Sequence, residues 1–210
     1  MAAAEVLPGF AGVAVHDGWA PYWRFAHATH ALCGAHLLRE LDAIADQPGQ
    51  GWAAGMAELL VDVKLAADRA RAAGCGRVDD DARVRLQGRY RRLLSDGQAA
   101  NPPPRAAHRG RVRRSPAANL LARLDRHREE VLRSLDDTRV PFDNNQAERD
   151  LRMVKLQQKI SGCWRTLAGA EAFLILRSYL STARKHGMNP LTALRQLFEG
   201  HPWLPAPVQP

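Results

Sequence analysis

Apolar residues along this chain recur mostly at the three- and four-residue spacing of amphipathic helices. The clearest case is the stretch 56–73, whose apolar positions fall on one face: Leu59, Leu60, Val63, Ala66, Ala67 and Ala70. The same pattern predicts further helices over these stretches: 35–45, 80–94, a segment after Pro116 that includes Leu120 to Leu135, 146–157 and 169–185. A last helix should follow Asn189, with Asn189 as the N-cap and Pro190 at the first position.

Two short stretches show strand patterns instead. Residues 10–15 place Phe10, Val13 and Val15 among small residues, and the turn pair Asp17-Gly18 closes the stretch. Residues 28–33 form a second strand candidate. With two short strand candidates followed by many helices, the sequence predicts an α/β fold that is mostly helical.

One segment between the predicted helices is neither helix nor strand. Residues 101–116 begin with Asn101 and three consecutive prolines, which helices and central strands do not accommodate. A dense run of arginines follows the prolines, so the segment is predicted to be a poorly ordered basic loop. The tail 201–210 holds several prolines and is predicted to be irregular.

Charge and cysteine content narrow the choice of partner and compartment. The 210 residues carry a net charge of +8, with a pI of about 10.1, which favours binding to polyanions such as DNA. A genome rich in GC codons would also raise the arginine content, and composition alone does not separate the two explanations. The three cysteines show neither a disulfide framework nor Cys-x-x-Cys spacing, which indicates a reducing cytoplasm. No apolar run approaches the ~20 residues that span a bilayer, and residues 1–10 do not resemble a signal peptide.

Two carboxylates are the strongest candidates for chemistry. Asp17 directly follows a predicted strand, and ligands of open α/β sheets bind at the carboxyl ends of strands. An Asp-Gly turn without chemistry is the common alternative. Glu148 lies in the first turn of a predicted helix, where it could hold a metal. It could equally close a capping box with Asn145, or pair with Arg152.

The segment His27, His30, Cys33 and His36 has ligand-type residues at every third position. Steps of three residues rotate by about 60° on a helix, and residues three apart alternate faces on a strand. The spacing therefore disfavours a closed tetrahedral zinc site built from this segment alone.

Basic residues cluster around Glu148 and in the loop. Lysine and arginine beside an acidic metal site could bind the phosphates that flank a reacting one, although a solvated helix face is the ordinary role of any single one. The DNA-binding candidates are Arg149, Arg152, Lys155, Lys159 and Arg165, together with Arg111, Arg113 and Arg114 in the loop.

Several motifs in a fixed order resemble the C-terminal part of transposases of the insertion sequence 66 family. They are Asp17-Gly18-Trp19-Ala20-Pro21-Tyr22, the segment from His30 to Glu40, Phe142 to Arg149, Lys159 to Arg165, and Arg177 to Pro190. No single motif is decisive, but the ordered set spans nearly the whole chain.

The resemblance implies a ribonuclease H-like fold with a helical insertion and an Asp-Asp-Glu triad that binds two Mg²⁺ ions. Asp17 matches the second Asp and Glu148 matches the Glu. Residues 1–36 would then hold the core strands, 37–140 the helical insertion, 141–200 the Glu-bearing and C-terminal helices, and 201–210 the tail. The first Asp of the family lies on an earlier strand, so we expect it upstream of Met1 and expect an incomplete core.

The function implied by the resemblance is DNA cleavage and strand transfer at the ends of a mobile element. The partners would be transposon ends, target DNA and other transposase subunits, in the bacterial cytoplasm and at the nucleoid when DNA is bound. With two of three carboxylates, this chain is expected to be an inactive or partial copy. The alternative is a non-catalytic basic helical protein that binds DNA or a full-length transposase.

Overall fold

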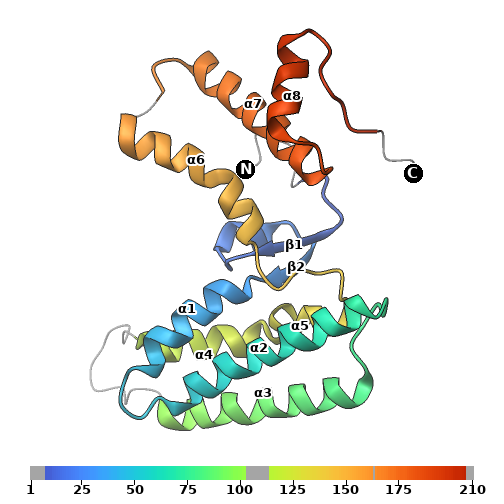
Figure 1. The fold of residues 1–210 in the computed structure, drawn as a ribbon. Coiled ribbons are helices and arrows are strands. Elements are labelled where there is room, and N and C mark those ends of the chain that lie inside the picture. The colour runs from blue at the N-terminus through green and yellow to red at the C-terminus, as the bar shows by residue number, and fades with distance from the viewer. Residues whose placement is uncertain (1–7, 103–113, 163, 207–210) are drawn as a thin grey trace. The chain divides into compact units, whose positions relative to one another are not determined.

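The computed structural model describes residues 8–102, 114–162 and 164–206 (Figure 1). The chain divides into two compact units, residues 1–145 (unit 1) and 146–210 (unit 2). Arg111, Arg113 and most of the predicted loop 101–116 lie outside the described residues, so their predicted roles and the predicted disorder of the loop stay predictions.

Unit 1 opens with two parallel strands, β1 (Val13–His16) and β2 (Thr29–Leu32). Val13 pairs with Thr29 and His16 with Leu32. The first strand starts and ends later than its predicted range 10–15, because Phe10 remains 36% exposed while His16 is buried. The connection between the strands contains a 3₁₀ helix, η2 (Ala20–Arg24), that the hydrophobic pattern does not reveal.

Five helices follow the strands and form most of unit 1 (Figure 1). They are α1 (Gly34–Ala45), α2 (Gly51–Ala72), α3 (Asp80–Ala100), α4 (Pro116–Arg126) and α5 (Arg128–Asp136). The α2 helix begins before its predicted start at residue 56, since Trp52 and Ala53 are themselves buried. The single helix predicted after Pro116 is wrong: the chain leaves helical geometry at His127 and starts a second helix.

The core of unit 1 lies between these helices. Side chains with no exposed surface include Leu41, Met56, Leu59, Tyr90, Leu124 and Leu135. Burying a leucine of this kind contributes about 1.5–3 kcal/mol. The Tyr90 hydroxyl donates to the carbonyl oxygen of Leu124 at 2.8 Å, so its polar atom is satisfied inside the core, and burial raises the pKa of this phenol. Leu32 of β2 belongs to the same core, with Trp23 packed against it.

The chain that leaves α5 is fixed to the end of α2. The Arg71 guanidinium donates to the carbonyl oxygens of Thr138 and Val140. The buried Thr138 hydroxyl donates to the carbonyl oxygen of Cys75 at 2.6 Å. These bonds hold residues 138–140 and so set the path of the chain into the Phe142 motif.

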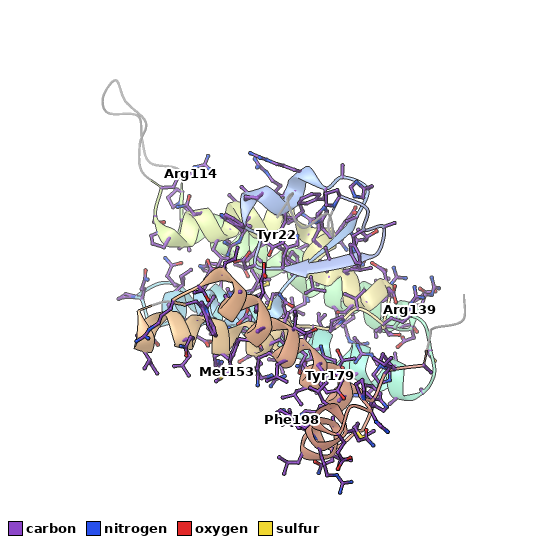
Figure 2. All side chains as sticks on the ribbon, turned by 90° about the horizontal axis from the view of Figure 1, so that it is seen from above. Tyr22, Arg114, Arg139, Met153, Tyr179 and Phe198 are labelled. Carbon is purple, nitrogen blue, oxygen red and sulfur yellow. The ribbon has the colours of Figure 1, made fainter. Side chains whose placement is uncertain are left out.

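Unit 2 consists of α6 (Asn145–Ser161), α7 (Leu167–Lys185) and α8 (Pro190–Phe198). The N-cap prediction for α8 is confirmed, because the Asn189 side chain accepts from the amides of Leu191 and Thr192. The Tyr179 hydroxyl donates to the carbonyl oxygen of Ala193 at 3.2 Å and links α7 to α8. Figure 2 shows Tyr179 and Phe198 among the side chains of these helices. Residues 201–206 have no regular structure, as predicted.

The structure confirms a mostly helical α/β chain with a parallel strand pair. The division of unit 1 at residue 36 stays a prediction. Among the described residues, each helix is too short or too polar to cross a lipid bilayer.

Candidate functional site

Asp17 lies where the sequence predicts it, directly after the carboxyl end of β1. Its backbone turns sharply because Gly18 adopts a φ of 87°, a conformation that favours glycine. The Trp19 amide donates to Asp17 Oδ1 at 2.9 Å. Asp17 is therefore both a turn residue and an exposed strand-end carboxylate. Its Oδ2 accepts no hydrogen bond from the residues that the structure describes.

A chain of two histidines holds this turn. The Gly18 amide can only donate, so Nδ1 of His16, at 3.0 Å, is the acceptor and Nε2 carries the proton. That Nε2–H donates to Nδ1 of His30 at 3.0 Å. The protonated Nε2 of His30 in turn donates to the carbonyl oxygen of Phe25 at 3.2 Å. Both imidazoles are thus neutral, with each tautomer fixed by a backbone group at the end of the chain.

Aromatic rings enclose the first histidine. Tyr22 stacks on His16 with ring centroids 4.6 Å apart, and Trp23 meets the same ring edge-on at 4.9 Å. Trp23 also stacks on His127 at 4.1 Å, which joins the turn to the break between α4 and α5. Burial, and next the neighbouring His30, lower the pKa of His16 to about 4. The imidazole therefore stays neutral at physiological pH.

The end of β2 reaches the same edge of the sheet, and the chain segment before α6 joins it there. The Gly34 amide donates to the carbonyl oxygen of Phe142 at 2.8 Å. The Asn144 amide lies 3.2 Å from Sγ of the buried Cys33. A Cβ on Gly34 would lie 2.2 Å from the Phe142 ring, so only glycine permits this approach. The parallel pairing thus brings Asp17 and residues 142–144 to one edge, although they are far apart in sequence.

Asp143 sits in this joining segment. Its Oδ1 accepts from the Asn145 amide at 3.0 Å, directly before α6. The helix begins at Asn145, so Asp143 accepts this bond at the start of α6, and the capping box of Asn145 with Glu148 stays an alternative. Asp143 is a further carboxylate, half-buried, whose backbone lies beside the carboxyl end of β2.

Glu148 lies in the first turn of α6, as predicted, and is half-buried. Helical periodicity places three cations on its face, at four, seven and eleven residues further along: Arg152, Lys155 and Lys159. All three are exposed. One face of α6 therefore combines a carboxylate near its N-terminus with a row of positive charges.

The comparison with protein families is decisive here. The model of the Transposase IS66 family matches residues 1–172, which include both Asp17 and Glu148. The chain belongs to this transposase family. No curated protein and no solved structure matches the chain.

The remaining DNA-binding candidates of this transposase are dispersed. Arg149 lies near the α6 N-terminus with its guanidinium 3.5 Å from the Gln146 side-chain oxygen. Arg165 is exposed between α6 and α7, and Arg114 is exposed just before α4. Arg114 belongs to unit 1, so it lies on a different unit from the candidates on α6.

The hydrogen-bonded His16–His30 pair and the aromatic rings around it did not follow from the sequence patterns. In the sequence, His30 stands out as a possible zinc ligand and as the start of a family motif, whereas in the fold both of its ring nitrogens form hydrogen bonds. His16, at the end of β1, was not among the predicted site residues. One signal was available in the sequence. A histidine, His16, ends the first strand, and a second histidine, His30, lies in the next strand.

Proposed function

We propose that this chain is part of an Asp-Asp-Glu transposase with a ribonuclease H-like core, in which Asp17 and Glu148 supply two of the three carboxylates. The reaction would be DNA cleavage and strand transfer at the ends of the element. The observation that carries the proposal is the exposed Asp17 carboxylate at the end of a parallel strand, in a chain of the transposase family. The paired carboxyl ends of β1 and β2 are the position expected of the second Asp.

The donor groups fit a divalent cation of the Mg²⁺ type. Mg²⁺ prefers carboxylate oxygens and retains several waters, so it needs few protein ligands. Asp17 uses Oδ1 for its own turn and leaves Oδ2 available. Glu148 offers a second carboxylate. Paired metal ions in such sites activate the attacking oxygen and stabilise the leaving oxygen.

The residues of the chain contribute to the reaction in three ways. The His16–His30 chain holds the Gly18 turn, which keeps Asp17 at the strand end. The carboxylates of Asp17 and Glu148 would bind the metal ions. Arg152, Lys155 and Lys159, on the Glu148 face of α6, would neutralise phosphates on either side of the reacting one.

Two carboxylates make an incomplete triad, and we propose that these 210 residues alone are inactive. Asp143 lies in the segment beside the carboxyl end of β2, so it is the candidate for a third ligand if the isolated chain proves active. Binding of DNA through the basic residues should persist without metal and weaken with salt.

The proposal is tested first by metal binding. Mn²⁺, a paramagnetic substitute for Mg²⁺, is titrated into the chain and followed by electron paramagnetic resonance. Asp17→Asn and Glu148→Gln should each weaken Mn²⁺ binding by tenfold or more. The matched control Asp81→Asn, an exposed acid at the start of α3, should leave it unchanged. Equal binding by all four proteins would refute the shared site.

Cleavage of labelled element ends in Mg²⁺ then tests activity. The wild-type chain should bind these ends without cutting them. Cutting that both substitutions abolish would show that the chain is complete and would direct attention to Asp143. Binding that is indifferent to metal, with no Mn²⁺ site, would support the non-catalytic DNA-binding alternative.

A further inference from the structure

A cleft of about 200 Å³ lies between α6 and α7, within unit 2, and its lining includes Leu174 together with polar residues. The residues used below are Asp150, Arg177, Ser178, Ser181, Thr182 and Lys185. Arg177, Ser181 and Lys185 are spaced by four residues, so they lie on one face of α7. None of them belongs to the metal site proposed above.

Asp150 organises one side of this cleft. Its carboxylate accepts from the Lys185 ammonium at 3.1 Å, from the Ser181 hydroxyl at 3.1 Å and from the Gln146 amide at 3.2 Å. The hydrogen bond from Lys185, followed by that from Ser181, holds the pKa of Asp150 below its usual range. The carboxylate is therefore ionised, and it fixes Lys185 and Ser181 at the wall of the cleft while cancelling one positive charge.

Arg177 is the cation that Asp150 does not neutralise. Its Nε is buried, and no acceptor for it exists among the side chains that the structure describes. A buried donor without an acceptor costs about 1–3 kcal/mol. Ser178 and Thr182 add hydroxyls to the lining next to it. The cleft thus presents a guanidinium and hydroxyl donors with one uncompensated positive charge, which is a site for a single anion.

We propose that this cleft binds one backbone phosphate of DNA, with Arg177 as the principal ligand and the Ser178 and Thr182 hydroxyls beside it. Arginine and Ser/Thr hydroxyls are common donors to DNA phosphates, and the planar guanidinium suits two phosphate oxygens. The proposal rests on the transposase function for the identity of the anion. It adds a contact on α7, separate from the basic face of α6.

The test measures binding of a fluorescein-labelled 30-base-pair duplex by anisotropy, in EDTA and over a range of salt. Arg177→Gln should weaken binding by roughly tenfold and lower the slope of log K against log salt by about one, as expected for one lost phosphate contact. Arg184→Gln, an equal loss of charge at an exposed position of the same helix, should keep the wild-type slope. Arg177→Lys should keep part of the affinity. Equal losses and equal slopes for Arg177→Gln and Arg184→Gln would overturn the proposal.

A second variant covers the case in which Arg177→Gln unfolds. Ser178 is exposed, so Ser178→Ala should leave the melting curve unchanged and weaken binding about threefold, the value of one hydrogen bond. Ser95→Ala, at an exposed position of α3, is its matched control and should bind as wild type. Wild-type affinity in Ser178→Ala with a failed Arg177→Gln would reject the site. Because EDTA removes metal, this assay does not depend on the proposed metal site, which separates its result from that of the metal-binding test.

Discussion

The two units of this chain bury their apolar residues very differently. In unit 1 the helices α1 to α5 and strand β2 share a continuous core. In unit 2, Ala183 and Ala193 are the buried apolar residues among those the structure describes. Large apolar side chains of unit 2 remain between 69% and 84% exposed: Ile160, Leu167, Ile175, Leu191 and Phe198.

This difference shows that a segment can have the local signals of a helix without burying apolar residues in a core. The helices of unit 2 have sound local signals, such as the Thr166 and Asn189 caps. Caps contribute about 1 kcal/mol each, whereas a folded domain depends on burial of apolar area. Among the residues whose burial the structure describes, most of the apolar core belongs to unit 1, and we expect unit 1 to provide most of the stability of the chain.

The largest expected effect comes from separating the units. A fragment of residues 1–145 should unfold cooperatively on heating, because its core is internal. A fragment of residues 146–210 should show little helix and no cooperative transition, because short helices without packing are marginal in water. Circular dichroism melts measure both. A cooperative melt of the isolated 146–210 fragment would contradict the claim that the two units differ in core formation.

A matched pair of leucine substitutions sharpens the comparison within the whole chain. Leu124→Ala leaves a cavity at a fully buried position of unit 1 and should lower the free energy of unfolding by about 2–5 kcal/mol. Leu191→Ala removes a side chain of unit 2 that is 76% exposed and should change it by less than about 0.5 kcal/mol. Urea unfolding followed by tryptophan fluorescence gives both values. Similar losses for the two variants would contradict the assignment of stability to unit 1.

The smallest of the three effects depends on pH and on His16. The pKa of this residue is about 4 in the fold against 6.5 for a free histidine, so the unfolded chain takes up the proton first. The lowered pKa of His16 contributes to the free energy of unfolding. This contribution is fully present above pH 6.5 and is lost as the pH falls toward 4, with a maximum loss of about 3 kcal/mol. Urea unfolding in EDTA at several pH values measures this loss. The reference is His16→Gln, which does not titrate and should show a shallower decline over the same range.

Much of the fold follows from the sequence because it depends on local rules. Asn189 caps α8 and the apolar spacing of α2 marks its buried face. The break at His127 did not follow, because Leu124 and Val131 are seven residues apart and so fit an unbroken helix. The exposure of apolar side chains on the unit 2 helices could not be predicted from the sequence either. Periodicity identifies the apolar face of a helix but does not show which residues cover that face.

Some residues of the candidate site could likewise be predicted from the sequence, and others could not. Asp17 and Glu148 could be identified from motifs, and their local positions at a strand end and in a first helical turn are as predicted. Their sharing of a metal stays a prediction. The support of Asp17 was not accessible, because His16 and His30 are fourteen residues apart and meet only through the parallel register of β1 and β2.

The histidine chain has a direction, and this has a consequence for motion. Each donor points the same way, from Gly18 through both imidazoles to the carbonyl oxygen of Phe25. A flip of either ring brings carbon atoms to the positions of its two nitrogens, so one rotation breaks two hydrogen bonds together. We therefore expect the turn that carries Asp17 and the segment that leads into β2 to open and close together.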